Sequence, residues 1–169
     1  ILSLNVSAVQ CKKRGFIDCL LQILEKYDVS PDEIEIEVTE TILIDDFDYI
    51  SERLGELKKT GVRISLDDFG TGFSSLSYLK GLPIDTLKID KTFVDTLLTD
   101  KNTKIITESI IYMVKRLGYE TIAEGVETKE QFQYLKELEC DMIQGYYMGR
   151  PMPAQGIADI LEKLTEKVG

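Results

Sequence analysis

The sequence predicts an α/β fold in which six βα units form an incomplete TIM-like (β/α) barrel. Short apolar segments that end in a polar residue alternate with longer amphipathic segments, which is typical of a parallel sheet covered by helices. The candidate strands number six, and at roughly 30 residues per βα unit they account for the 169 residues of the chain. A complete barrel of eight units needs roughly 250 residues.

The strands are predicted where short runs of Ile, Leu, Val and Thr end in a polar side chain. In chain order they cover residues 2–6, 34–39, 62–67, 86–89, 121–123 and 141–144. On a strand, alternate side chains point to opposite faces, so Glu37 is expected to point into the barrel while Ile36 and Val38 point outward at the helices.

The helices are predicted between and after these strands, at residues 16–27, 47–58, 75–80, 104–117, 129–137 and 157–167. The fourth has the clearest pattern, because its apolar residues fall on one helical face: Ile106, Ile110, Met113, Val114 and Leu117. Glycines follow three of the helices, and residues suited to N-caps precede three: Gly61, Gly81, Gly118, Asp46, Ser74 and Thr128. We find no linker or repeat beyond the βα rhythm, so residues 1–169 are interpreted as one domain.

The composition excludes several classes of function. Thirty acidic residues against 20 basic ones give a net charge of −10, which argues against binding a nucleic-acid polymer or an anionic membrane. The chain has no histidine, which excludes Ser-His and Cys-His nucleophile pairs and imidazole-ligated zinc. General acid–base chemistry is therefore expected from carboxylates and lysine.

The cysteines and the chain start bear on cellular context. Cys11, Cys19 and Cys140 are odd in number and widely spaced, which favours free thiols in a reducing, cytoplasmic compartment. No spanning segment or signal peptide is evident in the sequence. The chain begins with Ile1 rather than Met, and we interpret it as a piece of a larger protein.

Polar residues gather at the carboxyl ends of the predicted strands, the face on which barrel enzymes build their active sites. They are Asn5, Glu37, Glu40, Asp67, Asp68, Lys88, Asp90, Glu124, Glu127 and Gln144. Converging carboxylates repel one another, and hard divalent cations that prefer oxygen ligands relieve this repulsion. Two such ions about 3.5–4 Å apart can clamp a phosphoryl group. The pattern predicts a two-metal site with Lys88 as an additional positive charge.

Each of these groups also has an ordinary alternative. Asn5 could cap a turn, Asp67-Asp68 could cap a loop, and Glu124 with Glu127 could belong to a capping arrangement with Thr128. Glu37 and Glu40 could be exposed strand ends. Their coincidence at equivalent strand ends favours the metal site.

Two further segments are candidates for contacts with a substrate. The segment that begins Gly70-Thr71-Gly72 lacks the third glycine of the dinucleotide-binding motif and the Gly-Lys-Ser/Thr of a P-loop. It is interpreted as an active-site loop, and a plain turn is the alternative. Tyr146, Tyr147 and Arg150 could line a base-binding surface, whereas core packing is the alternative for the tyrosines.

At these positions the sequence resembles the EAL-domain phosphodiesterases that hydrolyse cyclic di-GMP in bacterial signalling. The resemblance runs essentially end to end. Its motifs are Asn5-Val6-Ser7-Ala8, Glu37-Val38-Thr39-Glu40, Asp67-Asp68-Phe69-Gly70-Thr71-Gly72, Leu87-Lys88-Ile89-Asp90, Ala123-Glu124-Gly125-Val126-Glu127 and Gln144-Gly145-Tyr146 with Arg150-Pro151.

The resemblance implies a role for each motif residue. Metal coordination is implied for Asn5, Glu37 and Asp67 at one ion and for Asp68 at the second ion. The catalytic residues implied are Lys88 and Glu124, which would orient and deprotonate the attacking water. Support of the loop or of the substrate is implied for Glu40, Gly70, Thr71, Gly72, Glu127, Gln144 and Arg150.

The resemblance also implies cofactors and partners. The cofactor would be Mg²⁺ or Mn²⁺, with Ca²⁺ inhibitory, and the product would be linear pGpG. A homodimer and an adjoining sensor or GGDEF domain are implied as partners. The Glu-Ala-Leu segment that names the family would precede Ile1, so its metal-binding Glu and phosphate-contacting Arg lie outside these residues. We expect activity to require that segment.

Two rival functions remain open from the sequence. One is a non-catalytic receptor for cyclic di-GMP, or a protein-interaction module, with the same fold. The other is a metal-assisted barrel enzyme that uses Lys88 as a base on a carbon acid, as enolase-type sites do.

Overall fold

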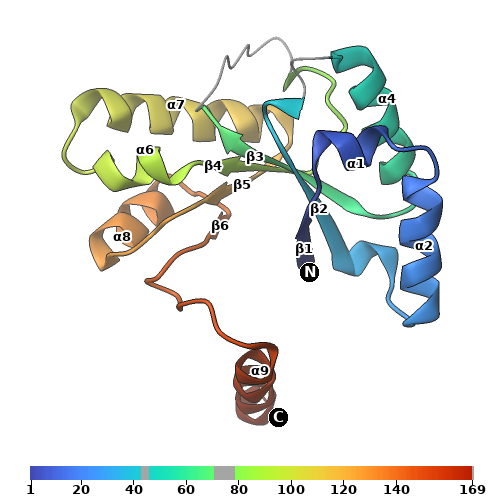
Figure 1. Cartoon of the computed structure of the whole chain (residues 1–169). Coiled ribbons are helices and arrows are strands. Elements are labelled where there is room, and N and C mark those ends of the chain that lie inside the picture. Colours follow the sequence, from blue (N-terminus) through green and yellow to red (C-terminus); the bar gives the residue numbers. More distant parts are fainter. Residues whose placement is uncertain (43–45, 71–78, 169) are drawn as a thin grey trace.

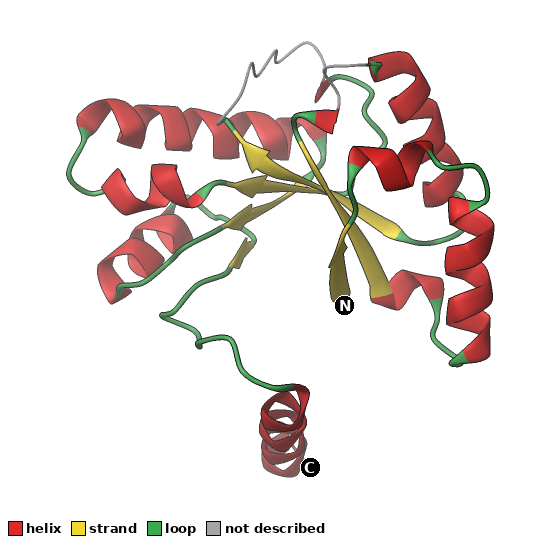
Figure 2. Cartoon of the chain, viewed as in Figure 1, coloured by secondary structure: helices red, strands yellow, loops and turns green. Residues whose placement is uncertain are grey.

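A curled parallel sheet organises the chain, with helices packed on its outer side (Figures 1 and 2). The computed structural model describes residues 1–42, 46–70 and 79–168, with side chains up to residue 161. Within these residues six strands lie in sequence order, and every neighbouring pair is parallel. They are β1 (Leu2–Asn5), β2 (Ile34–Thr39), β3 (Arg63–Phe69), β4 (Thr86–Ile89), β5 (Glu120–Ala123) and β6 (Met142–Ile143). The predicted incomplete TIM-like barrel is confirmed.

The helices flank the sheet in two groups (Figure 1). Beside β1–β3 lie α1 (Ala8–Lys12), α2 (Phe16–Lys26), the 3₁₀ turn η1 (Pro31–Glu33) and α4 (Phe47–Lys58). Beside β4–β6 lie α6 (Lys91–Thr96), α7 (Lys101–Leu117) and α8 (Lys129–Glu137). The last helix, α9 (Ala154–Val168), stands apart from the sheet after an extended segment. None of the helices in the described ranges is long and apolar enough to cross a membrane.

Alternation along the strands separates an apolar outer face from a polar inner face. Ile36 and Val38 are buried under the helices, and so are Ile64, Leu66 and Leu87. Between them stand polar side chains that contact one another across strands, as when Thr86 Oγ1 donates to Glu35 Oε2 over 3.0 Å. In many TIM barrels bulky aliphatic residues fill the interior. Here the outer layer supplies the hydrophobic core and leaves the inner face available for polar chemistry.

The predicted elements agree closely with the observed ones where the structure describes them. The predicted strand at 34–39 and helices at 47–58 and 129–137 match β2, α4 and α8 to the residue. The predicted helix at 75–80 falls largely on residues outside the described ranges. Three short elements were not predicted, α1, η1 and α6, because pieces of three to six residues are too short to show helical periodicity.

The buried face of α7 differs from the prediction. Thr107, Ile110, Ile111 and Val114 are buried, whereas Ile106 remains 46% exposed. Apolar residues cover a wide arc of this helix, so periodicity alone could not select the centre of the contact. The predicted N-caps also differ in quality: Thr128 forms a capping box with Gln131, while the Asp46 side chain makes no capping hydrogen bond.

Candidate metal centre

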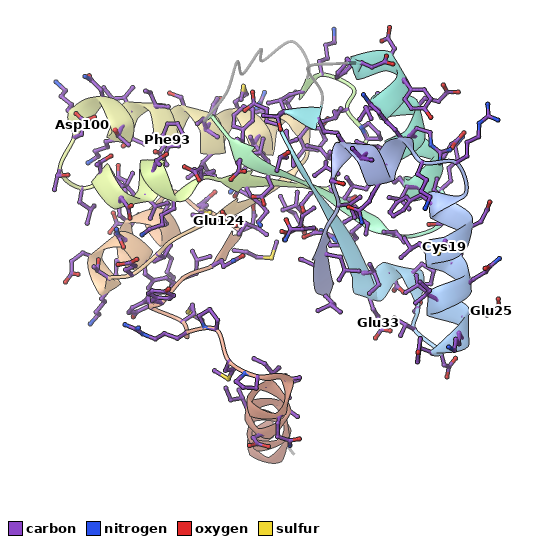
Figure 3. The ribbon with its side chains drawn as sticks, in the orientation of Figure 1. Cys19, Glu25, Glu33, Phe93, Asp100 and Glu124 are labelled. Atoms are coloured by element: carbon purple, nitrogen blue, oxygen red, sulfur yellow. The ribbon has the colours of Figure 1, made fainter. Side chains whose placement is uncertain are left out.

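The carboxyl ends of four neighbouring strands place a buried lysine among acidic side chains. Lys88, on β4, is only 3% exposed. Its Nζ lies 2.7 Å from Glu124 Oε1, 3.0 Å from Glu37 Oε2 and 3.3 Å from Asp67 Oδ1. Glu37 and Asp67 lie on β2 and β3, and Glu124 directly follows β5, as Figure 3 shows. We call these four residues together with Asp68 the acidic cluster.

An irregularity in β3 brings two consecutive aspartates to this cluster. Successive strand residues normally point to opposite faces, so Asp67 and Asp68 would diverge in a regular strand. The β3–β4 register shifts between Leu66 and Phe69, and Asp68 has a left-handed backbone with φ 56°. Such a bulge redirects side chains. As a result, carboxylate oxygens of Asp67, Asp68 and Glu124 lie within 4.8 Å of one another.

The electrostatics of the cluster favour a bound cation. Burial raises the pKa of Glu124, an effect that Lys88 opposes. Burial also raises the pKa of Asp68, and the neighbouring charges of Asp67 and Asp90 raise it further. Burial alone would lower the pKa of Lys88, but hydrogen bonds to Glu124 and Glu37 outweigh it and raise that pKa. The lysine therefore stays protonated, and one ammonium group faces more carboxylates than it can neutralise.

The donor set fits a hard divalent cation. Asp67, Asp68 and Glu124 offer only oxygen atoms and are partly exposed, so an ion can reach them from solvent. Oxygen-only ligands suit Mg²⁺, Mn²⁺ and Ca²⁺. Asn5 extends the set, because it ends β1 directly opposite Glu37 in the strand register and its side chain is exposed.

Glu40 lies just after β2 and holds the start of the glycine segment. The backbone N–H of Gly70 donates to Glu40 Oε2 over 3.1 Å, and Glu40 is 7% exposed. A side chain at Gly70, where φ is 98°, would lie 2.6 Å from the Phe93 ring, so glycine is required there. Support of the loop by Glu40 stays a prediction, to which this contact adds the anchoring of Gly70. Thr71 and Gly72 lie outside the described residues.

Replacing Glu40 with alanine is expected to cost about 1–3 kcal/mol of folding free energy, because the Gly70 N–H loses its acceptor. Urea unfolding measures this loss. Glu40→Gln retains an acceptor oxygen and is the matched control. Wild-type stability of Glu40→Ala would contradict this role.

The remaining candidates lie beside the acidic cluster. Glu127 Oε1 accepts from Lys91 Nζ at 2.7 Å, and its side chain is therefore paired rather than capping α8. Gln144 follows β6, is exposed, and donates its backbone N–H to Ala123. Arg150 is exposed and stacks on Tyr146, with 4.8 Å between the guanidinium carbon and the ring centroid.

A depression of about 270 Å³ opens next to Glu124. Its lining consists of Lys91, Glu124, Gly125, Glu127, Gln144, Gly145 and Tyr146. The structure thus brings Glu127 and Gln144 to one depression beside the acidic cluster. Lys91 was not predicted as a site residue, although it follows directly after the Leu87-Lys88-Ile89-Asp90 motif.

Comparison with known proteins identifies relatives over nearly the whole chain. The family model described as "EAL domain" matches residues 1–151. The signaling protein YkoW of Bacillus subtilis is 44% identical over 154 residues, which is 91% of this chain and 19% of YkoW. The bifunctional diguanylate cyclase/cyclic di-GMP phosphodiesterase MucR of Pseudomonas aeruginosa is 40% identical over 91% of this chain and 22% of MucR. The chain therefore spans about a fifth of the length of these relatives.

Solved structures show the same fold. The MucR phosphodiesterase in complex with c-di-GMP has a TM-score of 0.87 and 40% identity, covering 92% of this chain and 63% of that one. Klebsiella pneumoniae BlrP1 in a manganese/cy-diGMP complex has a TM-score of 0.80 and 31% identity, covering 86% of this chain and 37% of that one. With its motifs at matching strand ends, its curled parallel sheet and these matches, the chain belongs to the EAL domain family.

Proposed function

We propose that this chain forms the catalytic face of a metal-dependent phosphodiesterase that hydrolyses cyclic di-GMP to linear pGpG in bacterial second-messenger signalling. The observation that carries the proposal is the acidic cluster, in which carboxylates of Asp67, Asp68 and Glu124 converge beside a buried lysine. Relatives support it, since MucR is named a cyclic di-GMP phosphodiesterase and solved relatives hold cyclic di-GMP with manganese or calcium.

Asn5 and the residues of the acidic cluster divide into those that would hold metal and those that would handle the proton. Asn5, Glu37 and Asp67 would hold one Mg²⁺ or Mn²⁺, and Asp68 would serve a second. When bound, such ions neutralise phosphoryl charge and lower the pKa of water. We propose that Ca²⁺ occupies the same oxygen ligands without supporting turnover.

Glu124 is the proposed proton acceptor for the attacking water. Burial raises the pKa of Glu124 toward neutral pH, and a carboxylate with a raised pKa is a better proton acceptor than an exposed one. Lys88 is protonated and within 3.0 Å of both Glu124 and Glu37, so it orients these carboxylates and adds positive charge beside the phosphate. A protonated lysine is a poor base, which disfavours the enolase-type alternative.

The experiment compares this chain alone with the same chain joined to a Glu-Ala-Leu segment placed before Ile1. Purified protein is incubated with cyclic di-GMP and Mn²⁺, Mg²⁺ or Ca²⁺, and products are separated by anion-exchange chromatography. We expect pGpG with Mn²⁺ or Mg²⁺ when the upstream Glu-Ala-Leu segment is present, and little without it. Cyclic di-GMP that is bound but left intact by the longer protein would favour the receptor alternative instead.

We further propose that the chain on its own self-associates through its open sheet edges. Within the described residues β1 pairs only with β2 and β6 only with β5, and Leu2 on β1 is 61% exposed. Open apolar edges recruit further strands. Sedimentation velocity at micromolar concentration is expected to show a dimer or larger species, and a stable, folded monomer would contradict it. In the cell we place the domain in the cytoplasm, next to a sensor or GGDEF domain.

A further inference from the structure

Lys91, the first residue of α6, lies across the loop that carries Glu124. The ideal Cβ position at Gly125 is 2.3 Å from Lys91 Cγ and 2.8 Å from Lys91 Cβ and Cδ. The aliphatic part of the lysine therefore rests directly on the glycine backbone, where φ is 70°. Any other residue at position 125 would displace it.

The ammonium group of Lys91 forms ion pairs with two carboxylates, one on α6 and one on the loop after β5. Its Nζ lies 2.7 Å from Asp95 Oδ1, one turn further along α6, and 2.7 Å from Glu127 Oε1. Lys91 thus connects α6 to both ends of the segment Gly125–Glu127, by packing at one end and by an ion pair at the other. Glu124 immediately precedes this segment.

The backbone of the loop is already attached to the sheet on both sides. The Glu124 N–H donates to the Ile89 carbonyl on β4, and the Val126 N–H donates to the Gln144 carbonyl beyond β6, each over 3.0 Å. These bonds fix where the loop leaves the sheet. They leave the outward side of Gly125 and the Glu127 side chain to be held by Lys91.

From this geometry we propose that Lys91 is a positioning residue for the phosphodiesterase reaction: it bridges Asp95 and Glu127 across Gly125 and thereby keeps the Glu124 carboxylate at the acidic cluster. The proposal rests on the function proposed above. Lys91 lines the 270 Å³ depression beside Glu124 but is separate from the acidic cluster itself.

Removing the Lys91 charge should lower the activity of the protein without lowering its folding stability. The side chains of Lys91 and Glu127 are each 46% exposed, and exposed ion pairs contribute little to folding stability. A displacement of a reacting group by about 1 Å, in contrast, can lower the rate by about 100-fold. Loss of the Lys91 charge should therefore reduce turnover while the protein stays folded.

The test uses Lys91→Met, which retains most of the aliphatic stem, and Lys91→Arg, which retains the charge. Lys115→Met is the matched control, because Lys115 forms a comparable exposed pair with Glu139 at 2.9 Å at the end of α7. All are made in the longest form of the protein that hydrolyses cyclic di-GMP. The readouts are kcat, KM, Mn²⁺ affinity by calorimetry, and Tm.

We expect kcat of Lys91→Met to fall about 10–100-fold, with KM changed less than about threefold and Tm within about 2 °C. Mn²⁺ affinity is expected to fall about threefold or more, because the Glu124 carboxylate lies within 4.8 Å of those of Asp67 and Asp68, and moving it away removes negative charge beside the ion. Lys91→Arg should recover most of the turnover, and Lys115→Met should match wild type. The double variant Lys91→Met/Glu127→Gln should have nearly the same kcat as Lys91→Met, because both substitutions break the same ion pair.

Three outcomes would overturn the inference. The first is unchanged kcat and Mn²⁺ affinity in Lys91→Met. The second is a rise in KM alone, which would make Lys91 a substrate contact. The third is a loss of kcat in the double variant that equals the sum, in free energy, of the losses in Lys91→Met and Glu127→Gln. If the wild-type protein binds Mn²⁺ but leaves cyclic di-GMP intact, the proposed function fails, and the Mn²⁺ affinity of Lys91→Met then decides the inference by itself.

Discussion

Replacing Lys88 with methionine is expected to abolish measurable turnover, with a loss of at least about 100-fold, and to destabilise the metal-free protein by about 3–5 kcal/mol. The reason is that Lys88 is almost fully buried and compensates carboxylates from three neighbouring strands. Removing one partner of a buried ion pair leaves the others charged in a poorly solvated site. Urea unfolding without metal measures the stability loss, and chromatographic product assays measure turnover.

Metal should partly rescue the stability of this variant. If Mn²⁺ binds the folded acidic cluster as proposed, removing the Lys88 charge strengthens that binding, so Mn²⁺ should raise the unfolding midpoint of Lys88→Met more than that of wild type. Lys58→Met is a useful control, because Lys58 forms a half-exposed pair with Asp85 at 3.0 Å, away from the acidic cluster. Exposed pairs are worth about 0–1 kcal/mol. Equal stability of Lys88→Met and Lys58→Met would contradict the compensating role of Lys88.

Replacing Asp67 with asparagine is expected to lower turnover by more than about 100-fold and to weaken Mn²⁺ binding by at least as much. These losses exceed the 10–100-fold that is typical of residues that contact the metal ligands rather than the metal. Asp67 contributes both to the clustered carboxylate oxygens and to the contact with Lys88. Its Oδ1 also accepts the Asp68 backbone N–H over 2.9 Å, which helps to hold the left-handed conformation of that residue. Calorimetric titration with Mn²⁺ measures the loss of binding, and chromatographic product assays measure turnover.

Asp85→Asn provides the matched control for Asp67→Asn. Asp85 precedes β4, at the end of that strand opposite to the acidic cluster, and accepts the Ile64 N–H over 3.0 Å. The Asp85→Asn substitution therefore removes the charge of a partly buried carboxylate away from the cluster. It should lower stability while Mn²⁺ affinity stays within about twofold of wild type. If Asp67→Asn binds Mn²⁺ as tightly as Asp85→Asn, the assignment of Asp67 as a ligand is wrong.

Much of the fold and the location of the site could be predicted from the sequence. The strand at 34–39 was predicted to the residue because an uninterrupted pattern of Ile and Val defines its outer face. The carboxyl ends of parallel strands meet at one edge, so Glu37, Lys88 and Glu124 could be assigned to one site before any contact was known. The inward direction of Glu37 followed from alternation alone.

Other features could not be predicted in this way. Alternation places Asp67 and Asp68 on opposite faces, and only the bulge between Leu66 and Phe69 brings both to the cluster. The partners of Lys88 come from three strands, and their distances depend on how tightly the sheet curls. The buried side of α7 and the contact between Lys91 and Gly125 likewise depend on packing between elements distant in sequence.

The sequence by itself therefore determined the element order, the polar inner face and the set of residues at the strand ends. The tertiary structure decided which of those residues touch, that Lys88 is enclosed by acids, and that α6 supports the Glu124 loop. The physical reason is that periodicity reports which side of one element a residue occupies. The approach of side chains from different elements depends on strand register and sheet curl, which exist only in the folded chain.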